Sequence, residues 1–280
     1  MEDAYPLPDV TEISDQLGQS KYFSCIHMVM GYHQIEMAEE DRAKTAFSTK
    51  QGHWEYKRLT FGLKTAPATF QRMMNVVLSG LTGSRCFVFL DDIVVYAKSL
   101  ADHDAKIRQV FDRLRESNLK LKPEKCEFLR KEVSYLGHVI SENGVLPDKT
   151  KTKVIEEFPT PQTLKQLKSF LGSMSYYRRL FPGFSGLASP LHKLLKKDAR
   201  YEWTSEQERA FRGLKSKRIS PPILRYPDYS HKFILTTDAS NEGLGAVLSQ
   251  GEIGKDLPIA FTSRLLNKAE KNYSTTEKNF

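Results

Sequence analysis

The sequence predicts a mixed fold of α-helices and β-strands with enough apolar residues for a large core. Apolar runs of strand length, rich in aromatic and β-branched residues, recur at 22–29, 87–96 and 233–238. Between them lie helix-length stretches whose apolar residues return every three or four positions, at 66–77 and 164–171. With 280 residues, 40% of them hydrophobic, the chain is long enough for more than one domain.

Charge and cysteine content narrow the class of protein. The chain has 42 Lys and Arg against 34 Asp and Glu, and its net charge of +8 favours a polyanion such as nucleic acid as partner. Cys25, Cys86 and Cys126 are widely spaced, which argues against a disulfide framework and a zinc site. No apolar run reaches the roughly 18 residues that span a bilayer, and no signal peptide is recognisable. We therefore expect an intracellular, cytoplasmic protein without a membrane segment.

The first part of the chain predicts strands, a hairpin and two helices. A helical pattern with Val10, Ile13 and Leu17 precedes the strand at 22–29, and 44–49 and 52–59 are interpreted as strands of a meander. Pro67 opens a helix, because proline lacks only an amide that a first turn leaves unpaired. Ser99 caps the next helix. The apolar stripe of the helix after Pro67 is interpreted as core and consists of Phe70, Met73, Met74 and Val77.

The second part combines basic and apolar segments. Lysines and arginines crowd 120–131, and this run is either a solvated face or a nucleic-acid contact. A short hairpin is predicted at 135–140, ending at Asn143-Gly144. Helices follow at 164–171 and 206–214, and strands at 233–238, 243–250 and 259–263. Ser274 with Glu277 marks a further helix start.

The acid pair Asp91-Asp92 joins two apolar strand candidates and is the strongest chemical signal in the chain. Aspartate suits turns, so the pair can be an ordinary solvated turn. Two adjacent carboxylates nevertheless repel each other, and apolar flanks strengthen that repulsion unless a cation neutralises it. Mg²⁺, which prefers oxygen ligands, is the natural cation, and such a pair can hold the metals of a phosphoryl-transfer site. Both interpretations remain open on these residues alone.

The order of the motifs resembles the reverse transcriptase and ribonuclease H region of gypsy-type long-terminal-repeat retrotransposon Pol polyproteins. The resemblance covers essentially the whole chain. The stretches that carry it are Tyr5-Pro-Leu-Pro8, Gly31-Tyr-His-Gln-Ile35, Lys44-Thr-Ala-Phe47, Phe61-Gly-Leu-Lys-Thr-Ala-Pro-Ala-Thr-Phe-Gln71, Leu90-Asp-Asp-Ile93, Tyr135-Leu-Gly-His138, Ser169-Phe-Leu-Gly172 and Leu235-Thr-Thr-Asp-Ala-Ser240.

The resemblance implies an α+β right-hand polymerase. It assigns truncated fingers and the palm to 1–146, the thumb and connecting region to 147–227, and an incomplete ribonuclease H-like domain to 228–280. The implied activity is that of an RNA-directed DNA polymerase, a nucleotidyltransferase that extends a primer 3′-hydroxyl by two-metal chemistry. Its partners would be an RNA or DNA template with primer and deoxynucleoside triphosphates, within a virus-like particle. The oligomeric state is left open.

The resemblance also implies roles for individual residues. Asp91 and Asp92 would be catalytic metal ligands of the palm, and Asp238 a catalytic metal ligand of the ribonuclease H-like domain, with two Mg²⁺ expected in the family and Mn²⁺ as an alternative. The residues implied to bind the nucleotide are Gly31, Tyr32, Phe61, Gly62 and Lys125. The residues implied to contact nucleic acid are Leu136, Gly137, Lys165 and Lys168.

Three departures from the family pattern predict impairment. His27 stands where the family has a third palm aspartate, and imidazole offers no second oxygen to bridge two ions. The chain begins at the proline-rich lead-in, so upstream fingers strands are expected to be missing. Asn279 aligns with a family glutamate, with Glu277 two positions early. The leading hypothesis is a polymerase impaired by His27 and by truncation; the alternative is a non-catalytic nucleic-acid-binding remnant.

Overall fold

The computed structural model describes residues 5–8, 13, 15–18, 20–219 and 223–278. The chain divides into two compact units, the first formed by Met1–Leu136 with Ile140–Glu142 and the second by Gly137–Val139 with Asn143–Phe280. Over the described ranges, no helix combines the length and the apolar character that crossing a membrane requires. The three cysteines are free, as predicted.

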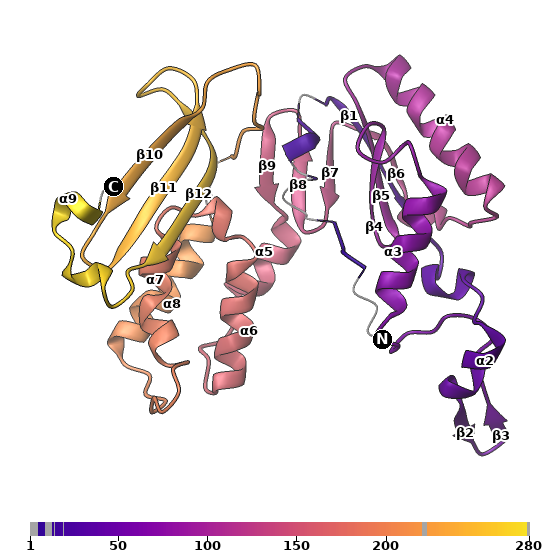
Figure 1. Ribbon diagram of the computed structural model, residues 1–280, viewed down its shortest axis with the longest axis horizontal. Coiled ribbons are helices and arrows are strands. Elements are labelled where there is room, and N and C mark those ends of the chain that lie inside the picture. The colour runs from indigo at the N-terminus through magenta and orange to yellow at the C-terminus, as the bar shows by residue number, and fades with distance from the viewer. Residues whose placement is uncertain (1–4, 9–12, 14, 19, 220–222, 279–280) are drawn as a thin grey trace. The chain divides into compact units, whose positions relative to one another are not determined.

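A four-stranded antiparallel sheet forms the base of the first unit (Figure 1), and its strand order is β4-β5-β1-β6. The strands are β1 (Tyr22–His27), β4 (Cys86–Phe89), β5 (Asp92–Ala97) and β6 (Glu127–Arg130). The predicted first strand and the predicted hairpin are thus confirmed. Strand β6 was not predicted, because its charged residues were interpreted as part of the basic run.

Helices α3 (Ala66–Val77) and α4 (Leu100–Glu116) pack against one face of this sheet. Pro67 lies in the first turn of α3, and the Ser99 hydroxyl accepts the amide of Asp102 at the start of α4, so both predicted helix starts are confirmed. The predicted stripe of α3 is core: Phe70 and Met74 are fully buried, and Met73 and Val77 are partly buried. The sheet side of this core includes Ile26, Met28, Val88, Ile93 and Val95.

Smaller elements connect these parts of the first unit. The predicted meander is present as a shorter hairpin, and of the predicted first helical pattern Ile13 and Leu17 are buried, while Val10 lies outside the described residues. The connecting elements are η1 (Gly31–Gln34), α2 (Glu39–Arg42), η2 (Ala43–Thr45), β2 (Phe47–Thr49), β3 (Gly52–Trp54) and η3 (Pro123–Lys125).

Three consecutive strands form a further sheet with the order β7-β8-β9. They are β7 (Glu132–Tyr135), β8 (His138–Ser141) and β9 (Gly144–Pro147). The hairpin predicted at 135–140 is confirmed as β7 and β8, and Asn143-Gly144 lies at the next turn. Leu136 and Gly137 form the first turn with φ values of 48° and 74°.

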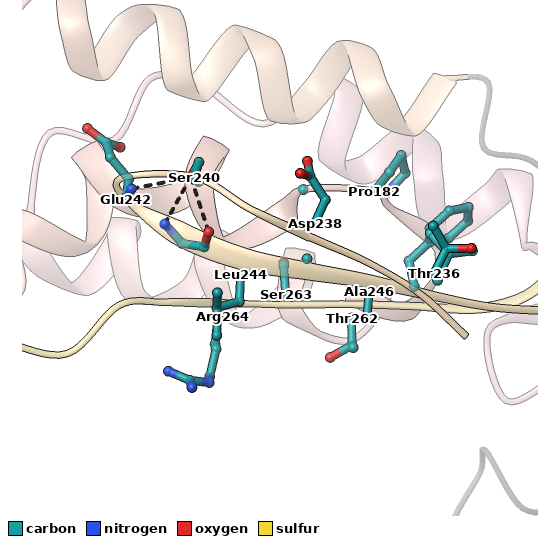
Figure 2. A pocket seen from close by; sticks show the side chains of 16 residues that line it. Pro182, Thr236, Asp238, Ser240, Glu242, Leu244, Ala246, Thr262, Ser263 and Arg264 are labelled. Atoms are coloured by element: carbon teal, nitrogen blue, oxygen red, sulfur yellow. Dashed lines mark hydrogen bonds between the residues drawn. The ribbon is translucent and has the colours of Figure 1, made fainter. Parts of the chain in front are cut away.

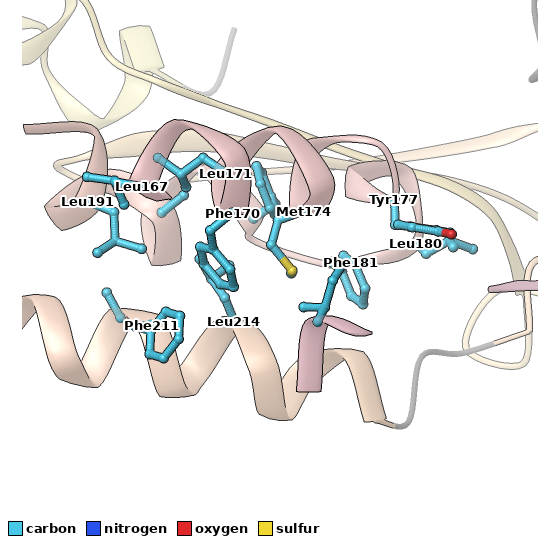
Figure 3. Close-up of a cluster of buried hydrophobic side chains, with 14 of the residues drawn as sticks. Leu167, Phe170, Leu171, Met174, Tyr177, Leu180, Phe181, Leu191, Phe211 and Leu214 are labelled. Carbon is cyan, nitrogen blue, oxygen red and sulfur yellow. The ribbon is translucent and has the colours of Figure 1, made fainter. Parts of the chain in front are cut away.

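The second unit has its own core, built by four helices (Figure 3). They are α5 (Lys149–Glu156), α6 (Leu164–Ser175), α7 (Phe184–Lys193) and α8 (Ser205–Ile219), with η4 (Arg178–Leu180) after α6. Figure 3 shows Phe170 and Met174 of α6 on the same cluster as Phe211 and Leu214 of α8. Helices α6 and α8 were predicted, whereas α5 and α7 were not.

An antiparallel sheet ordered β10-β11-β12 completes the second unit. Phe261 packs against the helical core, and the Ser185 hydroxyl donates a hydrogen bond of 2.7 Å to the carbonyl of Ser263, which ties α7 to β12. The remaining elements are β10 (Ile234–Ala239), β11 (Gly243–Gln250), β12 (Leu257–Leu265), η5 (Glu270–Asn272) and α9 (Thr275–Lys278). The predicted helix start is confirmed, because Ser274 and Glu277 exchange side-chain to backbone hydrogen bonds.

Candidate active site

The β4–β5 hairpin presents the acid pair at its turn. Asp91 lies in the turn, whereas Asp92 is already the first residue of β5 and pairs with Phe89 on one side and with His27 of β1 on the other. Leu90 adopts a φ of 53°, which bends the backbone sharply before Asp91. The side chains of Asp91 and Asp92 are 42% and 46% exposed, so both carboxylates can be reached by a ligand.

Gln71 of α3 holds this turn from beneath. Its side-chain amide donates 3.2 Å to the carbonyl of Val88, and its oxygen accepts the amide of Leu90 at 2.7 Å. Gln71 is fully buried, so these bonds form away from water, where an unpaired group would be costly. The sequence interpretation gave Gln71 no role, although a polar residue next to the apolar stripe of α3 was a visible signal.

His27, the last residue of β1, contacts both acids. Its Nδ1 lies 2.8 Å from Asp92 Oδ1 and its Nε2 lies 3.3 Å from Asp91 Oδ2. A neutral imidazole carries one N–H and can donate to only one of these oxygens, whereas the imidazolium donates to both. Among the residues that the structure describes, His27, Asp91 and Asp92 form the one group of three whose ligand atoms lie within 4.8 Å of one another.

Two groups near the acids, Cys25 and Tyr135, have raised pKa values. Burial, reinforced by the charge of Asp92, raises the pKa of the Cys25 thiol to about 12. Burial also raises the pKa of Tyr135, whose hydroxyl lies 3.4 Å from the backbone oxygen of Asp92.

The predicted nucleotide-binding residues fall into two sets. Gly31 is buried, and a Cβ atom there would lie 2.9 Å from the Phe70 ring and 3.4 Å from the Cβ of Asp91, so the backbone passes close to the acid turn. The Tyr32 ring lies 5.1 Å from the ring of Phe61, which is 66% exposed. The structure therefore brings Gly31 and Tyr32 close to Asp91, and Phe61 packs against Tyr32.

Gly62 and Lys125 form the second set. Gly62 follows Phe61 with a φ of 90° and has open space where a side chain would be. Lys125 ends η3, and its side chain is exposed. The adjacent Lys122 amide donates 2.9 Å to the carbonyl of His27, so η3 begins beside the end of β1.

The residues implied to contact nucleic acid lie on ordered elements. The carbonyl of Gly137 accepts the Tyr177 hydroxyl at 2.9 Å and the Asp148 amide at 3.0 Å, which fixes the Leu136-Gly137 turn from its second-unit side. Lys165 and Lys168 are exposed on α6, while Leu167 and Phe170 of the same helix are buried. The predicted division of α6 into one basic and one buried face is confirmed.

The first half of the chain, residues 1–140, matches the family described as reverse transcriptase (RNA-dependent DNA polymerase). The chain belongs to the reverse transcriptase family. It is 48% identical over 277 residues to the Retrovirus-related Pol polyprotein from transposon 297 and 38% identical over 288 residues to that from transposon gypsy, both of Drosophila melanogaster. Each alignment covers 99% of this chain, and the chain spans 26% and 27% of these relatives.

Solved structures of the family have the same fold. The foamy viral protease-reverse transcriptase dRH in complex with double-stranded DNA matches with a TM-score of 0.86 and 26% identity, over 98% of this chain and 49% of that one. The foamy viral protease-reverse transcriptase in complex with RNA/DNA hybrid matches with a TM-score of 0.83 and 25% identity, over 99% of this chain and 37% of that one. The predicted right-hand polymerase fold is confirmed.

Residues 203–280 match the RNase H-like domain found in reverse transcriptase, which includes Asp238. Asp238 is exposed on β10 and lines a cavity of about 560 Å³ together with Pro182, Ser240 and Glu242 (Figure 2). Arg264 and Lys278 line the adjoining cavity of about 420 Å³, which Asp238 shares. The Glu277 carboxylate is engaged by Ser274, and Asn279 lies outside the described residues.

Proposed function

We propose that this chain is the polymerase region of a gypsy-type retrotransposon Pol polyprotein, and that it derives from an enzyme extending DNA primers on RNA or DNA templates. The observation that carries the proposal is the exposed Asp91–Asp92 turn with Gly31 and Tyr32 packed close beside it. The foamy viral structures, which hold double-stranded DNA and RNA/DNA hybrid, support a nucleic-acid duplex as partner.

The proposal gives each side chain a task. Tyr32 would lie under the sugar of the incoming deoxynucleotide, where its bulk excludes a ribose 2′-hydroxyl, and Phe61 with Gly62 would lie along that nucleotide. Lys125 would attract its phosphates. The Leu136-Gly137 turn would hold the primer end, and Lys165 and Lys168 would contact the duplex backbone without reading its sequence.

The same proposal divides the chain as fingers and palm to residue 146, thumb and connection to 227, and ribonuclease H-like domain from 228. Asp238 would be a metal ligand of that last domain. Among the described residues Asp238 belongs to no group of three close metal-ligating side chains, and Arg178, Arg264 and Lys278 line its smaller cavity, so the proposal includes no RNA cleavage by these residues alone.

The donor set does not fit the pair of Mg²⁺ ions expected for the family. Mg²⁺ requires oxygen ligands in near-octahedral geometry, and a bridging carboxylate is what holds two such ions together. Here the third position is an imidazole whose two nitrogens already face the carboxylates at 2.8 and 3.3 Å. We therefore propose that Mg²⁺-dependent nucleotidyl transfer is impaired by His27.

One observation favours a second function. The His27 ring nitrogens face both Asp91 and Asp92, and Lys165 and Lys168 are exposed on α6 independently of that contact. The chain would then act as a non-catalytic nucleic-acid-binding protein.

Primer extension on an RNA template with Mg²⁺ separates the two functions. We expect His27→Asp to raise the extension rate at least about 100-fold over the natural chain, because it returns the missing oxygen ligand. His231→Asp is the matched control, since His231 also contacts an aspartate but at an exposed surface site. Robust extension by the natural chain would contradict the impairment.

The other outcomes of this experiment also distinguish the two proposed functions. If both chains bind primer-template but neither extends it, the non-catalytic function is favoured. If neither chain binds primer-template, both proposed functions are wrong.

A further inference from the structure

The contact between His27 and the two acids has a chemical meaning beyond lost Mg²⁺ affinity. Three side chains from two strands converge on one point: the imidazole from the end of β1, and two carboxylates from the β4–β5 turn. Their exposed fractions, 22% for His27 and 42% and 46% for the acids, leave room for water at the same point. The inference concerns the centre of the proposed polymerase and rests on that assignment.

The spacing of these atoms fits ligands of a single ion. Bonds from a transition metal to imidazole nitrogen or carboxylate oxygen are about 2.0–2.2 Å long. Two such ligands lie about 3.0 Å apart when their bonds meet at a right angle and about 3.4 Å apart in a tetrahedral arrangement. One His27 ring nitrogen and one oxygen each of Asp91 and Asp92 lie within 4.8 Å of one another, so small side-chain shifts bring them to these separations around one ion. The 2.8 and 3.3 Å contacts join different ring nitrogens to the two acids, and only one of these nitrogens can bind that ion.

The donor atoms decide which class of ion binds. Imidazole suits Zn²⁺ and its first-row neighbours, which also accept carboxylate oxygen, whereas Mg²⁺ gains little from a nitrogen ligand. The nearby Cys25 does not enter the set, because the group of ligand atoms within 4.8 Å of one another consists of His27, Asp91 and Asp92 among the described residues. The set is therefore one nitrogen and two carboxylates, with water completing the coordination.

We propose that His27, Asp91 and Asp92 bind one first-row transition-metal ion, such as Zn²⁺ or Mn²⁺, in place of the pair of Mg²⁺ ions expected for the family. Zn²⁺ binds more tightly than Mn²⁺ here, following the general order of divalent metal affinity, and both bind more tightly than Mg²⁺. The bound ion neutralises the acid pair that the apolar strands would otherwise leave in mutual repulsion.

Calorimetric titration of the full chain with Zn²⁺, Mn²⁺ and Mg²⁺ tests this selectivity. We expect His27→Gln to weaken Zn²⁺ binding at least about tenfold, since a metal ligand is worth at least as much as the groups that orient it. His27→Asp should weaken Zn²⁺ relative to Mg²⁺, because it exchanges nitrogen for oxygen. His231→Gln removes a histidine that faces the single carboxylate of Asp228 and should leave the site unchanged.

A second measurement locates the ion and guards against misfolded variants. With ¹⁵N-labelled histidine, Zn²⁺ should shift the ring nitrogen signals that His27→Gln removes, and circular dichroism should show that this variant remains folded. Equal Zn²⁺ affinity in the natural chain and in folded His27→Gln would overturn the proposal, as would Mg²⁺ competing on equal terms. These readouts measure binding alone, so failure of primer extension by His27→Asp would count against the proposed polymerase and not against the metal site.

Discussion

The acid pair Asp91 and Asp92 of the first unit and Asp238 of the second unit differ in how many secondary-structure elements place side chains beside them. Asp91 and Asp92 sit on a turn clamped by Gln71 and are met by His27 from a neighbouring strand. Asp238 stands on an exposed strand, and the basic side chains that share its smaller cavity are Arg178, Arg264 and Lys278. Both sites lie in family motifs, but among the described residues only the acid pair belongs to a group of side chains that could hold a metal ion.

This difference shows that membership of the family and the ability to bind a metal depend on different residues. A motif such as Leu90-Asp-Asp-Ile93 identifies the family, whereas metal binding depends on the third side chain that the sheet places opposite the pair. In the first unit the side chain opposite the pair is His27, and the proposed preference for a transition-metal ion rests on its nitrogen. In the second unit, the described residues place no comparable partner beside Asp238.

The largest expected effect comes from removing an acid in a chain where polymerase chemistry has been restored. In the His27→Asp background, Asp92→Asn should reduce primer extension at least about 100-fold, because it removes a charged group that acts on the reacting phosphates. Asp238→Asn in the same background should change extension less than twofold. Measured extension rates on one primer-template decide this, and equal losses for the two variants would erase the contrast between the sites.

The next largest effect is expected from removing the two hydrogen bonds by which Gln71 holds the acid turn, which we call the clamp. Gln71→Leu leaves the Leu90 amide and the Val88 carbonyl without their partner, and we expect a loss of about 1–3 kcal/mol in the free energy of unfolding. In the His27→Asp background it should also lower extension, because the acids lose their fixed position.

Gln207→Leu is the matched control for the clamp. Gln207 is buried in the second unit and bonds Thr204 and the carbonyl of Pro190. Its loss should reduce stability similarly, by urea unfolding, without reducing the extension rate of the fraction that remains folded. A clamp variant that loses stability but keeps full extension would show that Gln71 only supports the fold.

The elements that could be predicted from the sequence are those with a recognisable pattern within a few residues. The β4–β5 hairpin, α4 with its Ser99 cap and the three strands from β10 to β12 have regular apolar spacing or caps, so short-range patterns are sufficient. Helix α7 was missed because it contains Gly186 and Pro190, and β6 was missed because all four of its residues are exposed and two are charged. These elements form because of what they pack against.

The candidate site also depends on contacts between distant residues, which local sequence patterns do not predict. The acid pair and the odd histidine were visible in the sequence, but the contact of His27 with Asp92 depends on a register between strands 65 residues apart. Gln71 reaches Leu90 across 19 residues, a contact that no local pattern encodes. Sequence reasoning therefore found the acid pair and His27 as candidate ligands, and could not find the Gln71 hydrogen bonds that hold the turn.

A smaller effect concerns the basic face of the second unit. Lys165→Gln with Lys168→Gln should lower the slope of log binding constant against log salt by roughly 2 for duplex DNA, since each phosphate contact contributes about 0.9. Affinity for a primer-template, measured by fluorescence anisotropy between low and moderate salt, gives this slope.

The matched double variant removes two exposed lysines elsewhere in the unit, Lys232 and Lys255. We expect it to leave the slope unchanged. An equal reduction by both double variants would mean that net charge, and not the face of α6, attracts the duplex.

The smallest expected effect is a difference between the two units in how their histidines make stability depend on pH. His103 of α4 is buried, its Nε2 lies 3.0 Å from the Ser24 hydroxyl, and burial lowers its pKa, an effect that nearby Asp102 and Asp104 oppose. Because the folded form holds the neutral imidazole, its contribution to stability is present above the unfolded value of about 6.5 and is lost as the pH falls below it.

The free energy of unfolding should therefore differ less between pH 7.5 and pH 5 in His103→Gln than it does in the natural chain. Burial also lowers the pKa of His192 in the second unit, yet that side chain is largely exposed, so water can solvate the charged form. His192→Gln should accordingly change the pH dependence less than His103→Gln does. The reverse order would mean that the acid sensitivity of this chain arises in the helical core of the second unit and not beneath the sheet that carries Asp91 and Asp92.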